Sequence, residues 1–260
     1  SIDSLSNGLN TIYSGLDKII RVIRYDQNSP KKYDLVNSIY LEALPILYSK
    51  TISDSELVCF FYKKSFISII NIDTQKSQTI YNLFKNNGNV LFTDINLSKS
   101  MILVCSATEY SLVDIKSLKI IKQNQFIGKI TGCSFINENV FVLGCNGQSL
   151  YCFDPLKNFK LPLFKSETMH SVFKGGYGYL IVGIANGFIK VFQFRNNFEL
   201  LKTIDNLTTE ITSIGLNSKY FSYASKWKPN CIRIVDLDSL NVIQGWPNLK
   251  TKLARVSSIY

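Results

Sequence analysis

The sequence predicts an all-β fold, a WD40-type β-propeller with seven blades, the last of them incomplete in this chain. The main observation is a recurring apolar strand that ends in an aromatic or aliphatic residue followed by a polar one. These endings are Tyr25-Asp26, Ile72-Asp73, Val113-Asp114, Phe153-Asp154, Phe192-Gln193 and Val235-Asp236. They recur about every 40 to 45 residues, the length of a four-stranded propeller blade. The segments between them are short, rich in Val, Ile, Phe and Tyr, and separated by turn residues, as strands are.

We expect a single domain over residues 1–260, with blades at about 1–41, 44–83, 89–123, 128–164, 168–204 and 209–244. The strands expected in the six blades, in order, are 1–6, 10–15, 18–26 and 36–41; 44–52, 55–61, 65–72 and 77–83; 89–95, 100–106, 109–114 and 117–123; 128–135, 138–144, 148–153 and 159–164; 168–173, 177–183, 187–194 and 198–204; 209–215, 219–225, 231–236 and 239–244. A last strand, 253–260, opens the seventh blade. Seven blades need roughly 280–315 residues, so we expect the native protein to continue past Tyr260.

Two turns support these strands. Asn146-Gly147 and Asn186-Gly187 each lie between two apolar runs. Because Asn-Gly accepts positive φ at both central positions of a type I′ turn, each pair predicts a tight β-hairpin.

Composition restricts the class of protein. Of 260 residues 46% are hydrophobic and 13% aromatic, which is enough for a large core and too apolar for disorder. The net charge of +10 fits either a solvated lysine-rich surface or a surface that binds nucleic acid or an acidic partner. The chain opens without a basic region followed by an apolar run, so no secretory signal is predicted. The six cysteines form no CxxC pair, which predicts free, mostly buried thiols in a reducing compartment.

The residues needed for catalysis are missing from the sequence. The single histidine, His170, lies on a predicted strand, where a lone histidine is more often structural than catalytic. No Gly-x-Ser-x-Gly elbow and no phosphate-binding Gly-x-x-x-x-Gly-Lys-Ser/Thr loop occurs. Gly175-Gly176-Tyr177-Gly178 does not open a helix and carries no lysine, so it is interpreted as a strand-connecting loop. We therefore expect no enzyme activity, no cofactor, no metal and no small-molecule substrate, and no membrane association.

Two basic stretches with a tryptophan each are the candidate RNA-binding or partner-binding sites. The first is the loop 225–230 and the second is the link 246–255. Lysine and arginine can meet phosphates while an exposed tryptophan stacks on a base. The alternative is that both tryptophans pack against the blade and the lysines are only solvated. The candidate residues are Lys226, Trp227, Lys228, Trp246, Lys250, Lys252 and Arg255.

Three stretches resemble the U3 small nucleolar RNA-associated protein 18 family. They are 38–46 near the start, 128–154 in the middle, and 231–247, which reads Cys231-Ile-Arg-Ile-Val-Asp-Leu-Asp-Ser-Leu-Asn-Val-Ile-Gln-Gly-Trp246-Pro247. The resemblance implies a seven-bladed WD-repeat propeller of the small-subunit processome, in its UTP-B group around the U3 snoRNP. It implies a non-catalytic scaffold in the nucleolus that acts in processing of the pre-rRNA for 18S rRNA. Implied partners are other UTP-B proteins and U3 snoRNA or pre-rRNA.

This chain departs from the family pattern in three respects, one of which is that it ends before the family's final three strands. Family members carry an N-terminal extension that recruits a helicase, and this chain begins at the first blade. It also lacks the Gly-His and Trp-Asp pairs of regular WD repeats. The main alternative is a generic WD-repeat adaptor, such as a substrate receptor of a ubiquitin ligase or a vesicle-coat subunit, and the net charge and the end motifs favour the processome scaffold over it. A propeller enzyme is the third hypothesis.

Overall fold

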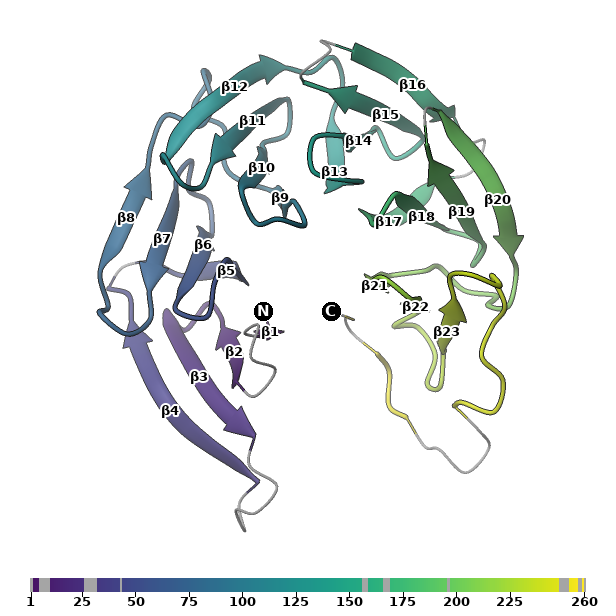
Figure 1. Ribbon diagram of the computed structural model, residues 1–260, viewed down its shortest axis with the longest axis horizontal. Coiled ribbons are helices and arrows are strands. Elements are labelled where there is room, and N and C mark those ends of the chain that lie inside the picture. The colour runs from purple at the N-terminus through teal and green to yellow at the C-terminus, as the bar shows by residue number, and fades with distance from the viewer. Residues whose placement is uncertain are drawn as a thin grey trace. The chain divides into compact units, whose positions relative to one another are not determined.

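The computed structural model describes residues 2–4, 10–25, 32–42, 44–155, 159–165, 169–195, 197–247, 253–256 and 259. Every regular element in these ranges is a β-strand (Figure 1). None of the described segments is a helix with the length and apolarity needed to cross a bilayer. The chain divides into two compact units, Ser1–Leu91 with Glu109–Gln125 and Phe92–Thr108 with Phe126–Tyr260.

The first unit holds two antiparallel sheets and one further strand pair. In the first sheet β1 to β4 follow one another in order, and in the second sheet β5 to β8 do the same. The pair is β11 with β12. The bounds are β1 Ile2–Ser4, β2 Asn10–Ser14, β3 Ile19–Tyr25, β4 Tyr33–Tyr40, β5 Ile46–Thr51, β6 Glu56–Phe61, β7 Ile67–Asn71, β8 Ser77–Ile80, β11 Glu109–Asp114 and β12 Lys119–Gln125.

The core of the first unit lies between the two sheets. Side chains alternate between the faces of a strand, so in β3 Ile20 and Val22 are buried while their neighbours are more accessible. They join Ile12 and Ile39 of the same sheet and pack against the second sheet, where Leu57, Cys59, Phe61 and Ile70 complete the cluster.

The second unit holds three sheets and one strand pair. Its sheets run in the orders β13-β14-β15-β16, β17-β18-β19-β20 and β21-β22-β23, and β9 pairs with β10. The bounds are β9 Phe92–Ile95, β10 Met101–Cys105, β13 Ile130–Phe135, β14 Phe141–Cys145, β15 Ser149–Asp154, β16 Phe159–Lys165, β17 His170–Gly176, β18 Tyr179–Ile184, β19 Ile189–Phe194, β20 Phe198–Ile204, β21 Ser213–Leu216, β22 Tyr220–Ala224 and β23 Ile232–Asp236.

The sheet β17–β20 is apolar on both faces, because it lies between two other sheets and both of its faces are buried. On one face Leu180, Val182 and Phe192 pack against Val142, Leu150 and Cys152 of the preceding sheet. On the other face Ile181, Ile189 and Val191 pack against Ile214, Phe221 and Val235 of the following sheet. These two clusters hold the three sheets of the second unit face to face.

The described residues confirm the all-β prediction, and the repeated antiparallel four-stranded sheets fit a β-propeller. The predicted strand 239–244 is wrong, because only an isolated bridge between Val235 and Val242 forms there. Gly245, with φ of 83°, ends the extended backbone of this stretch. The last sheet therefore has three strands in the described part of the chain. The predicted strand 253–260 is also not formed in its described residues, 253–256 and 259.

The two Asn-Gly turns differ. At Asn146 and Gly147 φ is 51° and 72°, and the Gln148 N–H donates to the Cys145 carbonyl, which confirms the type I′ turn. At the second pair only Gly187 has positive φ, and its N–H donates to the Ile184 carbonyl. The type I′ prediction is wrong there, because the longer connection forms an ordinary turn that ends in a left-handed glycine.

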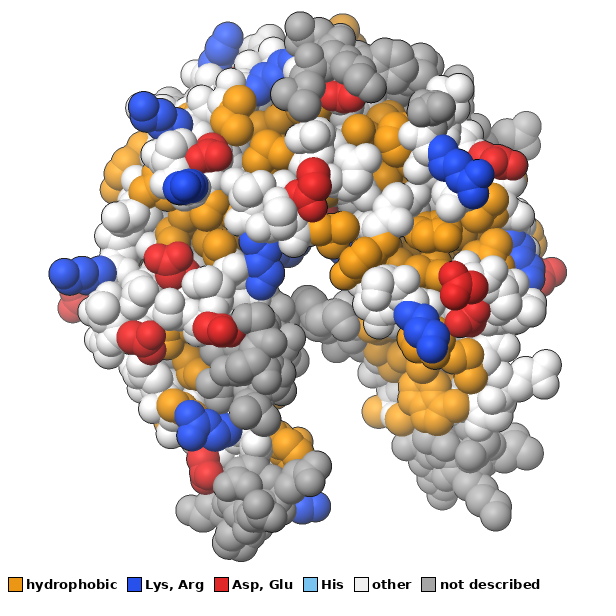
Figure 2. Space-filling view, viewed as in Figure 1, with side chains coloured by type: hydrophobic (Ala, Val, Ile, Leu, Met, Phe, Trp, Pro, Cys, Tyr) orange, Lys and Arg blue, Asp and Glu red, His pale blue; other side chains and the backbone are white. Residues whose placement is uncertain are grey.

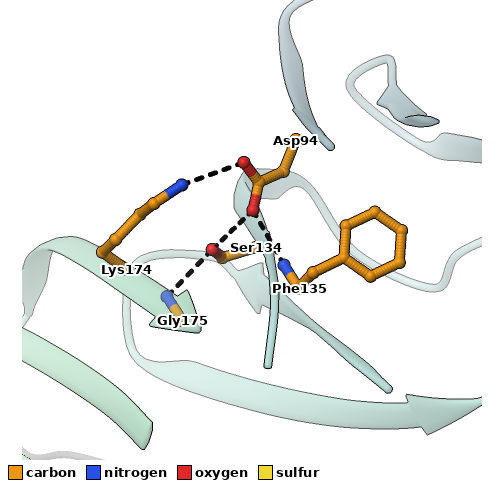
Figure 3. A network of polar contacts seen from close by, with 5 residues as sticks. All are labelled: Asp94, Ser134, Phe135, Lys174 and Gly175. Atoms are coloured by element: carbon orange, nitrogen blue, oxygen red, sulfur yellow. Dashed lines mark hydrogen bonds and ion pairs between the residues drawn. The ribbon is translucent and has the colours of Figure 1, made fainter. Parts of the chain in front are cut away.

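A buried polar network joins three edge strands of the second unit, β9, β13 and β17 (Figure 3). Asp94 of β9 accepts hydrogen bonds from the Ser134 hydroxyl (2.8 Å) and the Phe135 N–H (2.9 Å) of β13. Its other oxygen lies 2.9 Å from the Lys174 ammonium group of β17. The Gly175 N–H donates to Ser134 Oγ at 2.9 Å. Because a buried carboxylate is costly unless it is paired and hydrogen-bonded, this network fixes how the three strands meet.

Candidate partner-binding site

The loop 225–230 connects β22 to β23 and carries three of the predicted site residues. The Lys226 N–H donates to Thr212 Oγ1 at 3.0 Å, which ties the start of the loop to the segment before β21. The Trp227 indole Nε1–H donates to Glu210 Oε2 at 3.0 Å. The Lys228 ammonium group lies 3.5 Å from Thr208 Oγ1. The loop therefore has a defined position against residues 208–212.

The ring of Trp227 is exposed but held in place. About half of this side chain is accessible to solvent. The Lys226 ammonium nitrogen lies 4.9 Å from the ring centroid, a cation–π distance. Together with the bond to Glu210, this contact orients the ring without burying it. About half of the Trp227 ring therefore remains available for contact with a partner.

The second basic stretch lies partly beside this loop. The Leu253 N–H donates to Asn230 Oδ1 at 2.7 Å, and the Ile259 N–H donates to Ser213 Oγ at 2.6 Å. Arg255 is exposed within this segment, and Trp246 is partly exposed. Lys250 and Lys252 lie outside the described residues. The structure therefore brings the described segment that holds Arg255 next to the loop 225–230.

Charge is mixed rather than concentrated on the face drawn in Figure 2. Lysine and arginine side chains there are interspersed with aspartate and glutamate, and apolar groups lie between them. The described basic side chains on this face are thus not gathered into one patch. The chain's net charge of +10 does not by itself point to a nucleic-acid groove.

The network at Ser134 has the residue types of a catalytic site but a structural arrangement. The Ser134 hydroxyl donates to Asp94 and accepts the Gly175 N–H, so its oxygen is engaged on both sides. The Lys174 ammonium group is paired with the Asp94 carboxylate and points at that oxygen, not at the Ser134 hydroxyl. Among the described residues, no group of His, Cys, Asp and Glu side chains is arranged to hold a metal ion.

His170 is buried at the start of β17. Its ring packs edge-on against Phe173, and Nε2 lies 3.3 Å from Thr131 Oγ1. In the described part of the chain Nδ1 has no hydrogen-bond partner. Burial lowers the pKa of His170 to about 4 from 6.5, so the neutral ring is the native form.

This burial predicts a pH-dependent stability. Since the native pKa lies below the unfolded value, the unfolded chain binds the proton more tightly, and stability falls as pH drops from about 6.5 to 4. Above pH 6.5 the effect is absent. Chemical unfolding over this pH range should show that the free energy of unfolding falls more steeply for the wild type than for His170→Asn, which has no titrating ring. Equal slopes for the two proteins would show that His170 does not carry the effect.

The cysteines behave as apolar core residues. All six are free thiols, and Cys59, Cys105, Cys145 and Cys152 are buried. Burial raises the pKa of Cys152 to about 12 and that of Cys59 far above its usual range. Because the thiolate is the reactive form, these thiols are inert.

The sequence analysis missed Thr208 and Glu210, the residues that position the candidate loop. Glu210 is 17 residues before Trp227, and Thr208 is 20 before Lys228. They lie in the connection between two sheets, where no periodic signal marks a side chain as a contact.

Comparison with known proteins gives one partial match. No family model matches the sequence. A segment of 100 residues, 36% of this chain, is 26% identical to the probable U3 small nucleolar RNA-associated protein 18 of Schizosaccharomyces pombe. The match covers 19% of that protein, so the chain spans about a fifth of the length of this curated relative. This relative carries the name of the family that the stretches at 38–46, 128–154 and 231–247 resemble.

Proposed function

We propose that this protein is a non-catalytic scaffold of the small-subunit processome, which acts in the nucleolus on the pre-rRNA that yields 18S rRNA. The similarity to a probable U3 small nucleolar RNA-associated protein carries this proposal. Repeated antiparallel sheets with exposed connecting loops suit docking. The partners are UTP-B proteins and U3 snoRNA or pre-rRNA.

The candidate contacts are the loop 225–230 and the segment 246–255. An exposed, oriented Trp227 with Lys226 and Lys228 beside it supports this choice. The hydrogen bond between Leu253 and Asn230 supports treating both stretches as one surface.

Affinity purification of the full-length protein tests the assembly. We expect U3 snoRNA and UTP-B proteins to be recovered well above the level found with an unrelated propeller protein. Recovery of ubiquitin-ligase subunits without U3 snoRNA would instead support the generic adaptor and contradict the processome role.

Replacing Lys226, Lys228, Lys250 and Lys252 together with alanine tests the surface. Folding should be unaffected, because the exposed Lys226 and Lys228 contribute little to stability. Recovery of the processome partners should fall about tenfold or more. If purified chain binds single-stranded RNA, each lysine that meets a phosphate should also lower the salt slope of binding by about 0.7. Unchanged recovery of both partners and RNA would remove this surface from the proposal.

A further inference from the structure

The connections at one end of the sheets of the second unit form a linked surface. The strands β13, β17 and β21 begin at this end, and β14, β18 and β22 end there, because neighbouring strands are antiparallel. We call this surface the loop rim and define it as residues 126–129, 145–148, 169, 185–188, 205–212 and 225–230.

Hydrogen bonds from the rim or from the adjoining His170 connect most of its neighbouring parts, and a close backbone approach at Gly187 connects the part 185–188 to 205–212. The contacts are Asn146 N–H to the Lys129 carbonyl (2.9 Å), His170 N–H to the Gly147 carbonyl (2.8 Å), Ala185 N–H to the Met169 carbonyl (3.0 Å), and Thr209 Oγ1 to Ser225 Oγ (2.8 Å). Gly187 also approaches residues 207–209 so closely that a Cβ at this position would lie 2.3 Å from the Leu207 carbonyl oxygen. The rim is therefore one surface made from three sheets.

Large apolar side chains project from successive parts of this surface. The exposed fraction is 89% for Ile127, 57% for Met169, 39% for Phe188 and 52% for Trp227. Single exposed apolar residues are ordinary, but several on one linked surface indicate an interaction site. Aromatic residues and methionine are also the types enriched in protein–protein interfaces.

The charged groups of the loop rim favour an acidic partner. Lys129, Lys226 and Lys228 are exposed, against two carboxylates, Asp205 and Glu210. Glu210 also accepts the hydrogen bond of the Trp227 indole. The described rim thus carries three lysines against two carboxylates beside its apolar anchors.

We propose that the loop rim docks an acidic segment of another protein that carries spaced large apolar side chains. Ile127 and Met169 have no planar face on which a base stacks, whereas both fit the pockets of a peptide partner. The exposed aliphatic anchors of the rim therefore suit a peptide better than an RNA strand.

This docking surface does not depend on the processome role. If U3 snoRNA and UTP-B proteins fail to co-purify, the proposed function falls and the loop rim is untouched. If peptides fail to bind the rim, the docking proposal falls and the processome role is untouched.

The test is selection from a display library of random peptides of about 15 residues, a length that spans several anchors, on the purified chain. We expect the selected sequences to be enriched in Asp or Glu together with Leu, Ile, Phe or Trp. One selected peptide is then measured by fluorescence anisotropy against variants. Ile127→Asp and Met169→Asp should each weaken its binding about tenfold or more. Lys226→Glu with Lys228→Glu should weaken it as well, and exchanging the acidic residues of the peptide for lysine should restore binding to that variant.

The matched control is Leu200→Asp on β20, an exposed leucine outside the loop rim that is 49% accessible. This variant should bind the peptide with an affinity within about twofold of the wild type, as expected for a residue outside the contact. Thermal unfolding checks that each variant is folded, and Ile127→Ser replaces any aspartate variant that is not. Selection of no peptides, peptides without acidic residues, or equal losses for Leu200→Asp would overturn the proposal. A further result would overturn it: single-stranded oligo(U) RNA binds and requires Lys226 and Lys228, while Ile127→Asp and Met169→Asp leave the affinity for the peptide unchanged.

Discussion

Replacing Asp94 with alanine is expected to lower the free energy of unfolding by about 3 kcal/mol, because it leaves the partners of a buried charge unpaired. The carboxylate side chain is only 4% exposed and binds groups on two other strands. Its removal leaves the Ser134 hydroxyl and the Phe135 N–H without their acceptor, and Lys174 without its counter-charge. Urea denaturation of the purified chain measures the effect as a shift in midpoint.

The matched control for Asp94 is an exposed ion pair. Asp17 and Arg21 lie 2.6 Å apart, with side chains 47% and 37% exposed. Asp17→Ala should leave the urea midpoint close to that of the wild type, since solvent screens such a pair. The double variant Asp94→Ala with Lys174→Ala should cost less than the sum of its single variants, because the two residues share one interaction. A loss at Asp94 no larger than that at Asp17 would show that the network does not hold the three strands together.

Replacing Gly187 with alanine is expected to cost about 3 kcal/mol, from a backbone clash combined with an unfavourable backbone conformation. Its φ is 95°, and an added Cβ would lie 2.3 Å from the Leu207 carbonyl oxygen and 3.0 Å from the Thr209 nitrogen. These atoms belong to the backbone and cannot rotate away. The same variant should weaken binding of any partner of the loop rim, since residues 205–212 must shift.

Gly245 provides the control that separates the two causes. Its φ is 83°, and an added Cβ would have nothing within 4 Å. Gly245→Ala therefore reports the conformational cost alone, about 1 kcal/mol. Denaturation midpoints of both variants against the wild type give the difference. If Gly187→Ala costs no more than Gly245→Ala, the close approach to Leu207 is not a constraint.

Local pattern was sufficient for most of the strands. Alternating apolar residues in segments such as Ile19–Tyr25 specify which face is buried, because side chains on a strand alternate with period two. The pattern failed at 239–244, where Val242 has strand-forming character but makes only one bridge. Leu240 there has a φ of 53°, outside the extended region, and its carbonyl accepts a hydrogen bond from the Lys202 ammonium group at 2.8 Å. Such a contact leaves no trace in local sequence.

Only part of the loop rim could be predicted from the sequence. Lys226, Trp227 and Lys228 are adjacent in the chain, so their composition alone identified them. Ile127 and Met169 looked like ordinary members of apolar strands or their margins, and nothing in the sequence shows that their side chains are exposed. The single-domain assignment over residues 1–260 stays a prediction.

The sequence by itself determined an all-β chain of repeated short strands, because strand periodicity and turn chemistry are local properties. Tertiary structure alone decided which distant side chains meet. Asp94 and Lys174 are 80 residues apart in the chain. They pair because the strands β9, β13 and β17 pack side by side. In the same way, the antiparallel order of the strands brings connections from three sheets of the second unit to one end. The loop rim arises from that order, since a surface made of separate turns has no continuous sequence to encode it.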